Sequence, residues 1–336
     1  MPGLVNVGGS WKTVSNISVN VGGSWKAVNS AFVNIGGTWR PWGGLPVTPS
    51  KGFIVGGYQD GSGTKLTTVR KIAFSNGTWS SGANSLSGSA QSNGVCNQYN
   101  GYAAADYNFT AIRKIIFSNE TTSTISATWS GQNSGSGGIS NTDVAGYFLR
   151  QAQNQMTKFN FSNETSSTIS ATTSANGNFG SHFTNVGVAG YVVLGFNANT
   201  TVQKLALPAE TISTLSSGLT LGRGLTTGMS NVGTSGHVIG GRDNIGTVSY
   251  NTWEYWSYPS DTRSSGSTGF FAAGQRTTVT EYQKIGYACG GETDPNTSAL
   301  TNAVSKLTFS TNTWSSANSM ATVVASAVGL SESPGA

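Results

Sequence analysis

The side chains that most often perform chemistry are scarce in this sequence, which has two histidines and two cysteines among 336 residues. His237 takes the aromatic position of a repeated strand-like unit, which predicts a packed strand residue. His182 lies among Gly, Ser and Asn residues, which predicts a loop. Neither has cysteine or acidic neighbours at metal-ligand spacing, and no catalytic motif is present. Cys96 and Cys289 are predicted to be buried free thiols. We therefore expect no cofactor, no metal and no enzyme activity.

One set of polar residues is patterned, because it recurs directly after a strand-like segment in six places. Aromatic, amide, carboxylate and guanidinium groups around one mouth suit the hydroxyls and ring faces of sugars. Asp and Asn also favour ordinary turns, so plain turn residues are the alternative interpretation. The candidate ligand-binding residues are Tyr58, Asp60, Asp106, Tyr107, Arg150, Asn197, Arg242, Asp243, Glu292 and Asp294.

The elements that must position these residues form six repeats. A Gly-aromatic unit runs from GFIVGG at Gly52 to GYACGG at Gly286, with GHVIGG as its one imidazole variant, at intervals of 44 to 50 residues. A second marker keeps step with it, from RKIAFS at Arg70 to SKLTFS at Ser305, and only NTWEYWS at Asn251 blurs the pattern. Two markers in phase at a period in the forties indicate a propeller or a solenoid.

The residue types within the second marker decide between these two architectures. Apolar residues stand two apart, as in Ile72 and Phe74, which is the period of a strand with one buried face. Four short strands in about 45 residues make a propeller blade. The last repeat has Gly-Gly after a strand and TNTW before a Met, and it resembles the kelch repeat. The resemblance implies an all-β, six-bladed, kelch-like propeller over residues 51–336.

The end of the chain is expected to close this ring. A segment between successive repeats supplies the inner strand of the following blade, but the last repeat has no following blade. Blade one in turn lacks an inner strand, because a linker directly precedes Gly52. We therefore predict that Ser326–Glu332 completes blade one.

Blades two and three share a near copy, FSNETTSTISATWS at Phe117 and FSNETSSTISATTS at Phe161. Trp129 follows Phe117 by twelve residues, whereas Trp79 follows Phe74 by five. This spacing predicts a longer connection between the third and fourth strands in blade two than in blade one.

Residues 4–42 hold a different repeat of period 14, with VNVGGSWK at Val5 and Val19 and VNIGGTWR at Val33. Gly-Gly between two alternating runs predicts a tight hairpin. Hairpins of this size have little core of their own, so they either pack on the propeller or bury their Trp faces in a partner. Trp residues that only pack within the hairpin are the alternative interpretation. We predict a β-hairpin module over 1–42 and a linker over 43–50. The candidate docking residues are Trp11, Trp25 and Trp39.

The VNVGGSWK hairpins look like those of phage virion and tail proteins. The FSNET phrase and the STLSSGLTLGRGLTTGMSNVG segment resemble kelch-like proteins encoded by aquatic bacteriophages. The resemblance implies a virion protein in many copies, with a homo-oligomer as one arrangement, and with its hairpins on other virion proteins. Its leading function would be that of a tail fibre or adhesin that recognises host-surface polysaccharide. A structural capsid-decoration or tail-assembly protein is the alternative, and a glycan-processing enzyme comes third.

The composition limits the partners. Charged residues are 9% of the chain, and the net charge of +5 is scattered without a basic run, so a nucleic-acid partner is not expected. No apolar run approaches the roughly 20 residues of a membrane helix, and the N-terminus lacks the regions of a signal peptide. We therefore expect no membrane insertion, and release from the host by lysis as part of a phage particle.

Overall fold

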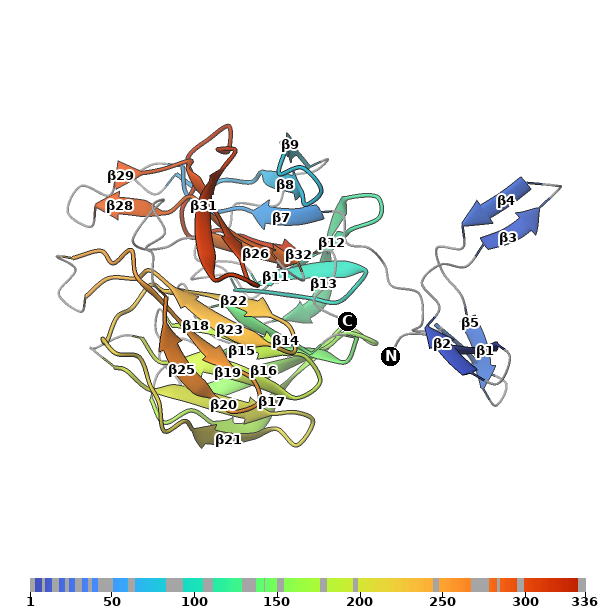
Figure 1. The fold of residues 1–336 in the computed structure, drawn as a ribbon, viewed down its shortest axis with the longest axis horizontal. Helices are drawn as coiled ribbons and strands as arrows, with labels where there is room; N and C mark the ends of the chain where they lie inside the picture. Colours follow the sequence, from blue (N-terminus) through green and yellow to red (C-terminus); the bar gives the residue numbers. More distant parts are fainter. Residues whose placement is uncertain are drawn as a thin grey trace. The chain divides into compact units, whose positions relative to one another are not determined.

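The computed structural model divides the chain into two compact units, Met1–Thr48 and Pro49–Gly335 (Figure 1). Every regular element in the described part of the chain is a β-strand. The structure describes residues 4–7, 10–13, 18–21, 24–27, 32–35, 38–41, 51–59, 64–82, 93–104, 111–128, 137–141, 143–149, 154–175, 180–195, 199–243, 248–266, 278–282, 285–294 and 299–331.

The first unit contains three separate two-stranded hairpins, as the period of 14 predicted. Within each hairpin an Asn of the first strand is paired with the Trp of the second, as in Asn6 and Trp11. The Trp side chains lie outside the description, so the docking role of Trp11, Trp25 and Trp39 stays a prediction. The hairpins are β1 (Leu4–Val7) with β2 (Ser10–Thr13), β3 (Ser18–Val21) with β4 (Ser24–Ala27), and β5 (Phe32–Ile35) with β6 (Thr38–Pro41).

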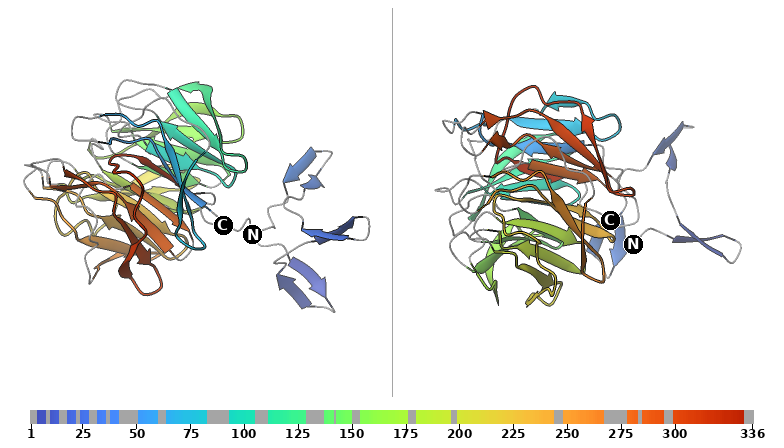
Figure 2. Two further views of the ribbon diagram at one scale, coloured as in Figure 1. Left: turned by 90° about the horizontal axis from the view of Figure 1, so that it is seen from above. Right: turned by 60° about the vertical axis from the view of Figure 1, so that its left-hand side comes forward.

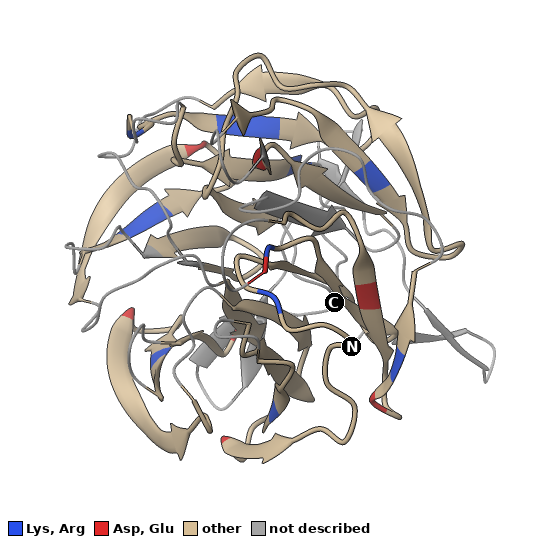
Figure 3. Cartoon of the chain, turned by 90° about the vertical axis from the view of Figure 1, so that its left-hand side faces the viewer, with Lys and Arg blue, Asp and Glu red and all other residues tan. Residues whose placement is uncertain are grey.

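The second unit is a six-bladed β-propeller, as predicted. Six four-stranded antiparallel sheets form its blades (Figure 2), and they are arranged in a ring around a common axis (Figure 3). We number the strands of each blade from first (innermost) to fourth (outermost). Blade 1 is β32 (Val328–Ser331), β7 (Lys51–Val55), β8 (Val69–Ala73) and β9 (Trp79–Ser81); blade 2 is β10 (Asn93–Cys96), β11 (Asn100–Ala104), β12 (Ala111–Ile116) and β13 (Thr121–Thr128); blade 3 is β14 (Gly138–Asn141), β15 (Ala145–Leu149), β16 (Gln155–Asn160) and β17 (Thr165–Thr172).

The remaining blades repeat the same meander, and blade 6 adds a small hairpin between its second and third strands. Blade 4 is β18 (Ser181–Asn185), β19 (Ala189–Val193), β20 (Val202–Ala206) and β21 (Thr211–Thr214); blade 5 is β22 (Thr227–Asn231), β23 (Ser235–Ile239), β24 (Trp253–Ser257) and β25 (Thr262–Ser265); blade 6 is β26 (Thr278–Tyr282), β27 (Ile285–Cys289), β30 (Val304–Thr308) and β31 (Thr313–Ala317), with β28 (Glu292–Asp294) and β29 (Ala299–Leu300) as the added hairpin.

The ring closes through its last strand, which confirms the sequence prediction. β32 pairs antiparallel with β7, with Val328 opposite Val55 and Ser331 opposite Gly52. Blade 1 is therefore built from both ends of the propeller chain. Because an unpaired inner edge would be open to other strands, this closure protects β7.

The antiparallel meander gives each blade two different ends. Connections between first and second strands and between third and fourth strands emerge at one end, which we call the turn face. Connections between second and third strands, and from each blade to the next, emerge at the other end, which we call the loop face. The predicted ligand-binding positions follow the second strand of each blade, so they belong to the loop face.

The inner edges of neighbouring blades are joined by side-chain hydroxyls. Cys96 N donates to Ser140 Oγ (3.1 Å), Ser140 N to Thr184 Oγ1 (3.3 Å), and Thr184 N to Ser230 Oγ (2.9 Å). Each hydroxyl thus satisfies a backbone N–H that the sheet of the preceding blade leaves free. These three bonds link the inner strands of blades 2, 3, 4 and 5 in sequence.

A second repeated contact holds neighbouring blades together on the turn face. A lysine of the third strand, and usually a tyrosine of the second, bind an acidic residue in the last turn of the next blade. We call these contacts latches. They join Lys71 and Lys51 to Glu120 (2.7 and 2.9 Å), Lys114 and Tyr102 to Glu164 (2.6 and 3.0 Å), Lys158 and Tyr147 to Glu210 (2.6 and 2.8 Å), and Lys204 and Tyr191 to Asp261 (2.7 and 2.6 Å).

The latch acids share a backbone conformation that the turn requires. All four, Glu120, Glu164, Glu210 and Asp261, have positive φ, between 54° and 58°, a region that non-glycine residues enter at some cost. Burial alone would raise the pKa of Glu120. Hydrogen bonds and charge from Lys71 and Lys51 outweigh this effect, so the pKa is lowered. Burial and the adjoining carboxylate raise the pKa of Tyr102 and Tyr147.

Two sequence predictions about single elements are wrong. His182 lies within strand β18, not in a loop, and its residue is 3% exposed. Small residues surround it because inner strands pack backbone to backbone: a Cβ on Gly228 would meet the His182 carbonyl oxygen. The third-to-fourth connection of blade 2 is the ordinary four-residue turn; the extra residues before Trp129 lengthen strand β13 instead.

Candidate functional site

Four of the predicted ligand-binding residues lie in the described part of the chain with their side chains. Tyr58 and Arg242 are half-buried and occupy equivalent positions after the glycines of blades 1 and 5. Asp243 accepts a hydrogen bond from Val248 N (3.1 Å) within its own turn. Glu292 lies in strand β28 and is 4% exposed, so its carboxylate is not presented to solvent. Outside the described residues or side chains lie Asp60, Asp106, Tyr107, Arg150, Asn197 and Asp294.

Double glycines shape the loop face at two seams. In blade 1 the chain arriving from blade 6 passes over Gly57, where a Cβ would lie 2.7 Å from Ala325 O. In blade 5 a Cβ on Gly241 would lie 2.7 Å from Gly224 O. Both glycines also have positive φ, of 94° and 105°, so glycine is required twice over. The crossings are pinned by backbone hydrogen bonds that Tyr58 exchanges with Ala325 and Arg242 with Gly224.

The crossing into blade 5 carries a buried ion pair. Arg223 is 1% exposed and donates to Glu254 (3.2 Å) and to Thr252 Oγ1 (2.6 Å). The N–H and the hydroxyl of Thr220 both donate hydrogen bonds to the Glu254 carboxylate. Arg263 Nη1 lies 3.5 Å from Glu254 Oε2. Burial lowers the pKa of Arg223, and the Glu254 charge opposes that effect. Because these charges satisfy one another away from solvent, we assign the cluster to structure.

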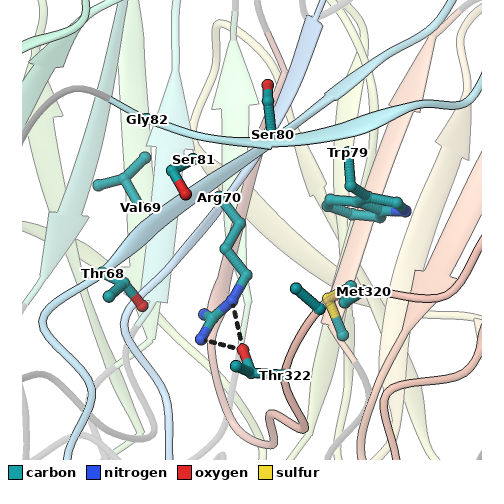
Figure 4. Close-up of a pocket in the computed structure, with 10 residues that line it drawn as sticks. Thr68, Val69, Arg70, Trp79, Ser80, Ser81, Gly82, Met320 and Thr322 are labelled. Atoms are coloured by element: carbon teal, nitrogen blue, oxygen red, sulfur yellow. Dashed lines mark hydrogen bonds between the residues drawn. The ribbon is translucent and has the colours of Figure 1, made fainter.

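The crossing into blade 1 instead borders a pocket of about 460 Å³ (Figure 4). The pocket lies between the strand ends of β8 and β9 at the loop face and the segment that leaves β31. Arg70 reaches across to this segment, where its Nε and Nη2 donate to Thr322 Oγ1 (3.0 and 2.7 Å). The lining residues are Thr68, Val69, Arg70, Trp79, Ser80, Ser81, Gly82, Met320, Ala321 and Thr322.

The histidines and cysteines form no reactive cluster. His237 is fully buried, stacks on Trp253 and Tyr255, and contacts Ser235 Oγ (3.0 Å), which confirms its prediction as a packed residue. Burial lowers the pKa of both His182 and His237 to about 3. Cys96 and Cys289 are buried free thiols, as predicted. Among the described residues, no three His, Cys, Asp or Glu side chains come close enough to hold a metal ion.

Charged residues in the described part of the propeller are sparse and spread over its blades (Figure 3). Most of the acidic side chains that the structure describes are engaged in the latches and in the Arg223 cluster. No helix in the described part of the chain has the length and apolarity of a membrane span.

No protein-family model matches the sequence, and no curated protein matches it either. Among solved structures, one described as the structure of YjhT is similar, with a TM-score of 0.56 and 9% sequence identity. The similarity covers 71% of this chain and 86% of YjhT. YjhT is a propeller protein, and at this identity the likeness shows the fold alone. The narrower kelch assignment stays a prediction.

The pocket residues escaped sequence reasoning because they come from segments about 250 residues apart, as Arg70 and Thr322 are. The predicted ring closure was the one sequence feature that indicated contact between the segments of Arg70 and Thr322. Arg70 opens the second repeated marker, and Trp79 follows that marker in the same blade, so the sequence pattern indicates blade structure for both.

Proposed function

We propose that this protein is a bacteriophage virion protein, of the tail-fibre or adhesin type, that binds a host-surface glycan through its loop face. The propeller fold itself fits a binding or adhesin-type role. The observation that supports glycan binding is the strand order. In the sequence, each of the six polar segments predicted to bind ligand follows the second strand of a blade, and the connections after the second strands belong to the loop face. Loops on a rigid frame can vary without disturbing the strands.

The low charge of the chain favours a polar polysaccharide over nucleic acid or an anionic membrane, because long-range steering is weak. Each contact can be weak, since many copies on one particle raise the avidity. The hairpin module would join the protein to other virion proteins through Trp11, Trp25 and Trp39. Deleting residues 1–42 should then give a protein that binds cells but does not enter particles.

The test of glycan binding is adsorption of the full chain, displayed in many copies on beads, to host cells. Replacing Tyr58, Tyr107, Arg150 and Arg242 together by Ala should abolish adsorption while the melting temperature stays unchanged. Val144→Ala with Val188→Ala is the control, because these exposed residues lie in turn-face connections. If the wild-type beads do not adsorb to cells or to extracted polysaccharide, the structural virion protein becomes the better reading.

A further inference from the structure

The pocket beside β8 and β9 combines an apolar wall, several hydroxyls and one positive charge. Its apolar wall is made by the Trp79 indole and Met320, which lie near one another in Figure 4. Its volume of about 460 Å³ falls within the usual range for small-molecule sites. The hydroxyl groups belong to Thr68, Ser80, Ser81 and Thr322.

The charge of Arg70 is not balanced within the described part of the chain. None of the ten lining residues is acidic, and Arg70 forms no ion pair with a described residue. Its Nε and Nη2 share one acceptor, Thr322 Oγ1, while Nη1 is buried without a hydrogen-bond partner. Burial lowers the pKa of Arg70, yet an arginine remains protonated. An anionic ligand would supply the counter-charge that the described protein lacks.

The aromatic wall is held in place before any ligand arrives. Trp79 Nε1 donates to Asn318 O (2.8 Å), and Asn318 Nδ2 donates to Gly77 O (3.3 Å). A fixed indole offers a flat apolar surface at little entropic cost on binding. Met320 beside it is adaptable in shape. An aromatic surface with surrounding hydroxyls suits a sugar ring, which has an apolar C–H face and polar edges.

We propose that this pocket binds one carboxylate-bearing sugar, of the hexuronic acid class, with its ring against Trp79 and its carboxylate on Arg70. The inference deepens the proposed function and rests on it only for the source of the sugar. Arg70 and Trp79 are not among the residues predicted from the sequence, so this site is additional to the second-strand loops. A guanidinium suits a carboxylate because it presents several donors in one plane.

The test is titration of the full chain with free glucuronate and with glucose, followed by ligand-detected nuclear magnetic resonance. Wild-type protein should bind glucuronate about tenfold or more tightly than glucose, because a charged hydrogen bond adds at least that factor. Arg70→Gln should remove the difference. Ser81→Trp, which fills the pocket from an exposed strand position, should remove binding of both sugars. Arg113→Gln is the matched control, since it holds the same strand position in blade 2.

Several results would overturn the proposal. Equal affinity for the two sugars would remove the role of the carboxylate, and undiminished binding by Arg70→Gln and Ser81→Trp would place the sugar elsewhere. Absence of any binding at about 10 mM sugar, a range that detects even weak sites, would refute the pocket outright. A protein that binds glucuronate but does not adsorb to host cells would instead refute the proposed function and leave the pocket standing.

Discussion

The turn face and the loop face of the propeller differ in how much they repeat from blade to blade. On the turn face, four successive seams carry the same lysine–acid latch, with nitrogen–oxygen distances of 2.6 to 2.9 Å. On the loop face, the segments that cross from one blade to the next carry different kinds of side chain at equivalent positions. Arg223 is buried in an ion-pair cluster at the entry to blade 5, whereas Val324 lies in an apolar cluster beside the pocket at the entry to blade 1.

This difference indicates that the two faces of each repeat have different roles. The repeated turns fix how one blade sits against the next, so the same solution serves at several seams. The loop-face connections only need to span from strand to strand, so their residues are free to set local chemistry. Changes on the loop face should therefore have effects that differ from seam to seam, while equivalent latches should behave alike.

The largest expected effect comes from opening the ring. Truncation after Met320 removes β32 and the crossing over Gly57, and leaves β7 with a free edge. We expect insoluble protein or loss of cooperative thermal unfolding, measured by solubility and circular dichroism. Truncation after Glu332 is the control, because it keeps β32. A soluble protein with an unchanged melting temperature after the shorter truncation would contradict closure.

The buried cluster of the loop face should give the next largest effect. Glu254→Ala leaves Arg223 buried without its carboxylate, which should cost about 3–5 kcal/mol in unfolding free energy. Chemical denaturation measures this loss. The double variant Arg223→Met with Glu254→Leu should lose less than the single one, because no unpaired charge remains. An equal or greater loss in the double variant would show that packing, not charge, dominates.

The buried histidines should make the fold sensitive to acid. Their pKa of about 3 in the fold lies below the unfolded value of about 6.5, so their contribution is complete above pH 6.5 and is lost progressively as the pH falls toward 3. When the pH falls from 7 to 5, each histidine should lower the free energy of unfolding by about 2 kcal/mol. Denaturation of His237→Phe at both values measures its share. If this variant loses as much stability as wild type, His237 does not titrate in this way.

A single latch should have the smallest effect. Lys158→Met removes a half-buried pair with Glu210 and should cost about 1 kcal/mol, near the upper end for exposed pairs. Lys306→Met is the matched control, since Lys306 holds the same strand position but has no ion pair with a described residue. Urea denaturation of both variants gives the comparison. A similar cost in the two would mean that the latches add nothing beyond packing of the lysine stem.

The sequence was sufficient for the blade count and the closure because both depend on local patterns. Gly52 to Gly286 mark every second strand, and the missing inner strand of blade 1 could be counted. Latches were missed because the partner of Lys114 is Glu164, 50 residues away, whereas the acid nearest in sequence is Glu120. Periodicity shows that strands exist, but it does not show which blade receives a side chain.

The site was less predictable than the fold for a related reason. Glu292 follows a second strand like its counterparts, yet it lies in the added strand β28 and is 4% exposed. His182 appeared to be in a loop because glycine and serine usually mark turns, although here they let inner strands approach closely. Both errors arise from tertiary packing, which overrides local propensity.

Ring closure also determines how the propeller can bear load. The chain enters the propeller at Lys51, the turn-face end of β7, which is paired on one side with β32 and on the other with β8. Hydrogen bonds between antiparallel strands run across the strand direction. A pull on the chain ahead of Lys51, against a ligand held on the loop face, therefore shears two ladders at once instead of unzipping them one bond at a time. If the protein is anchored ahead of Lys51 and binds through its loop face as proposed, the pairing of β7 with β32 and β8 would help it to resist unfolding under such a force.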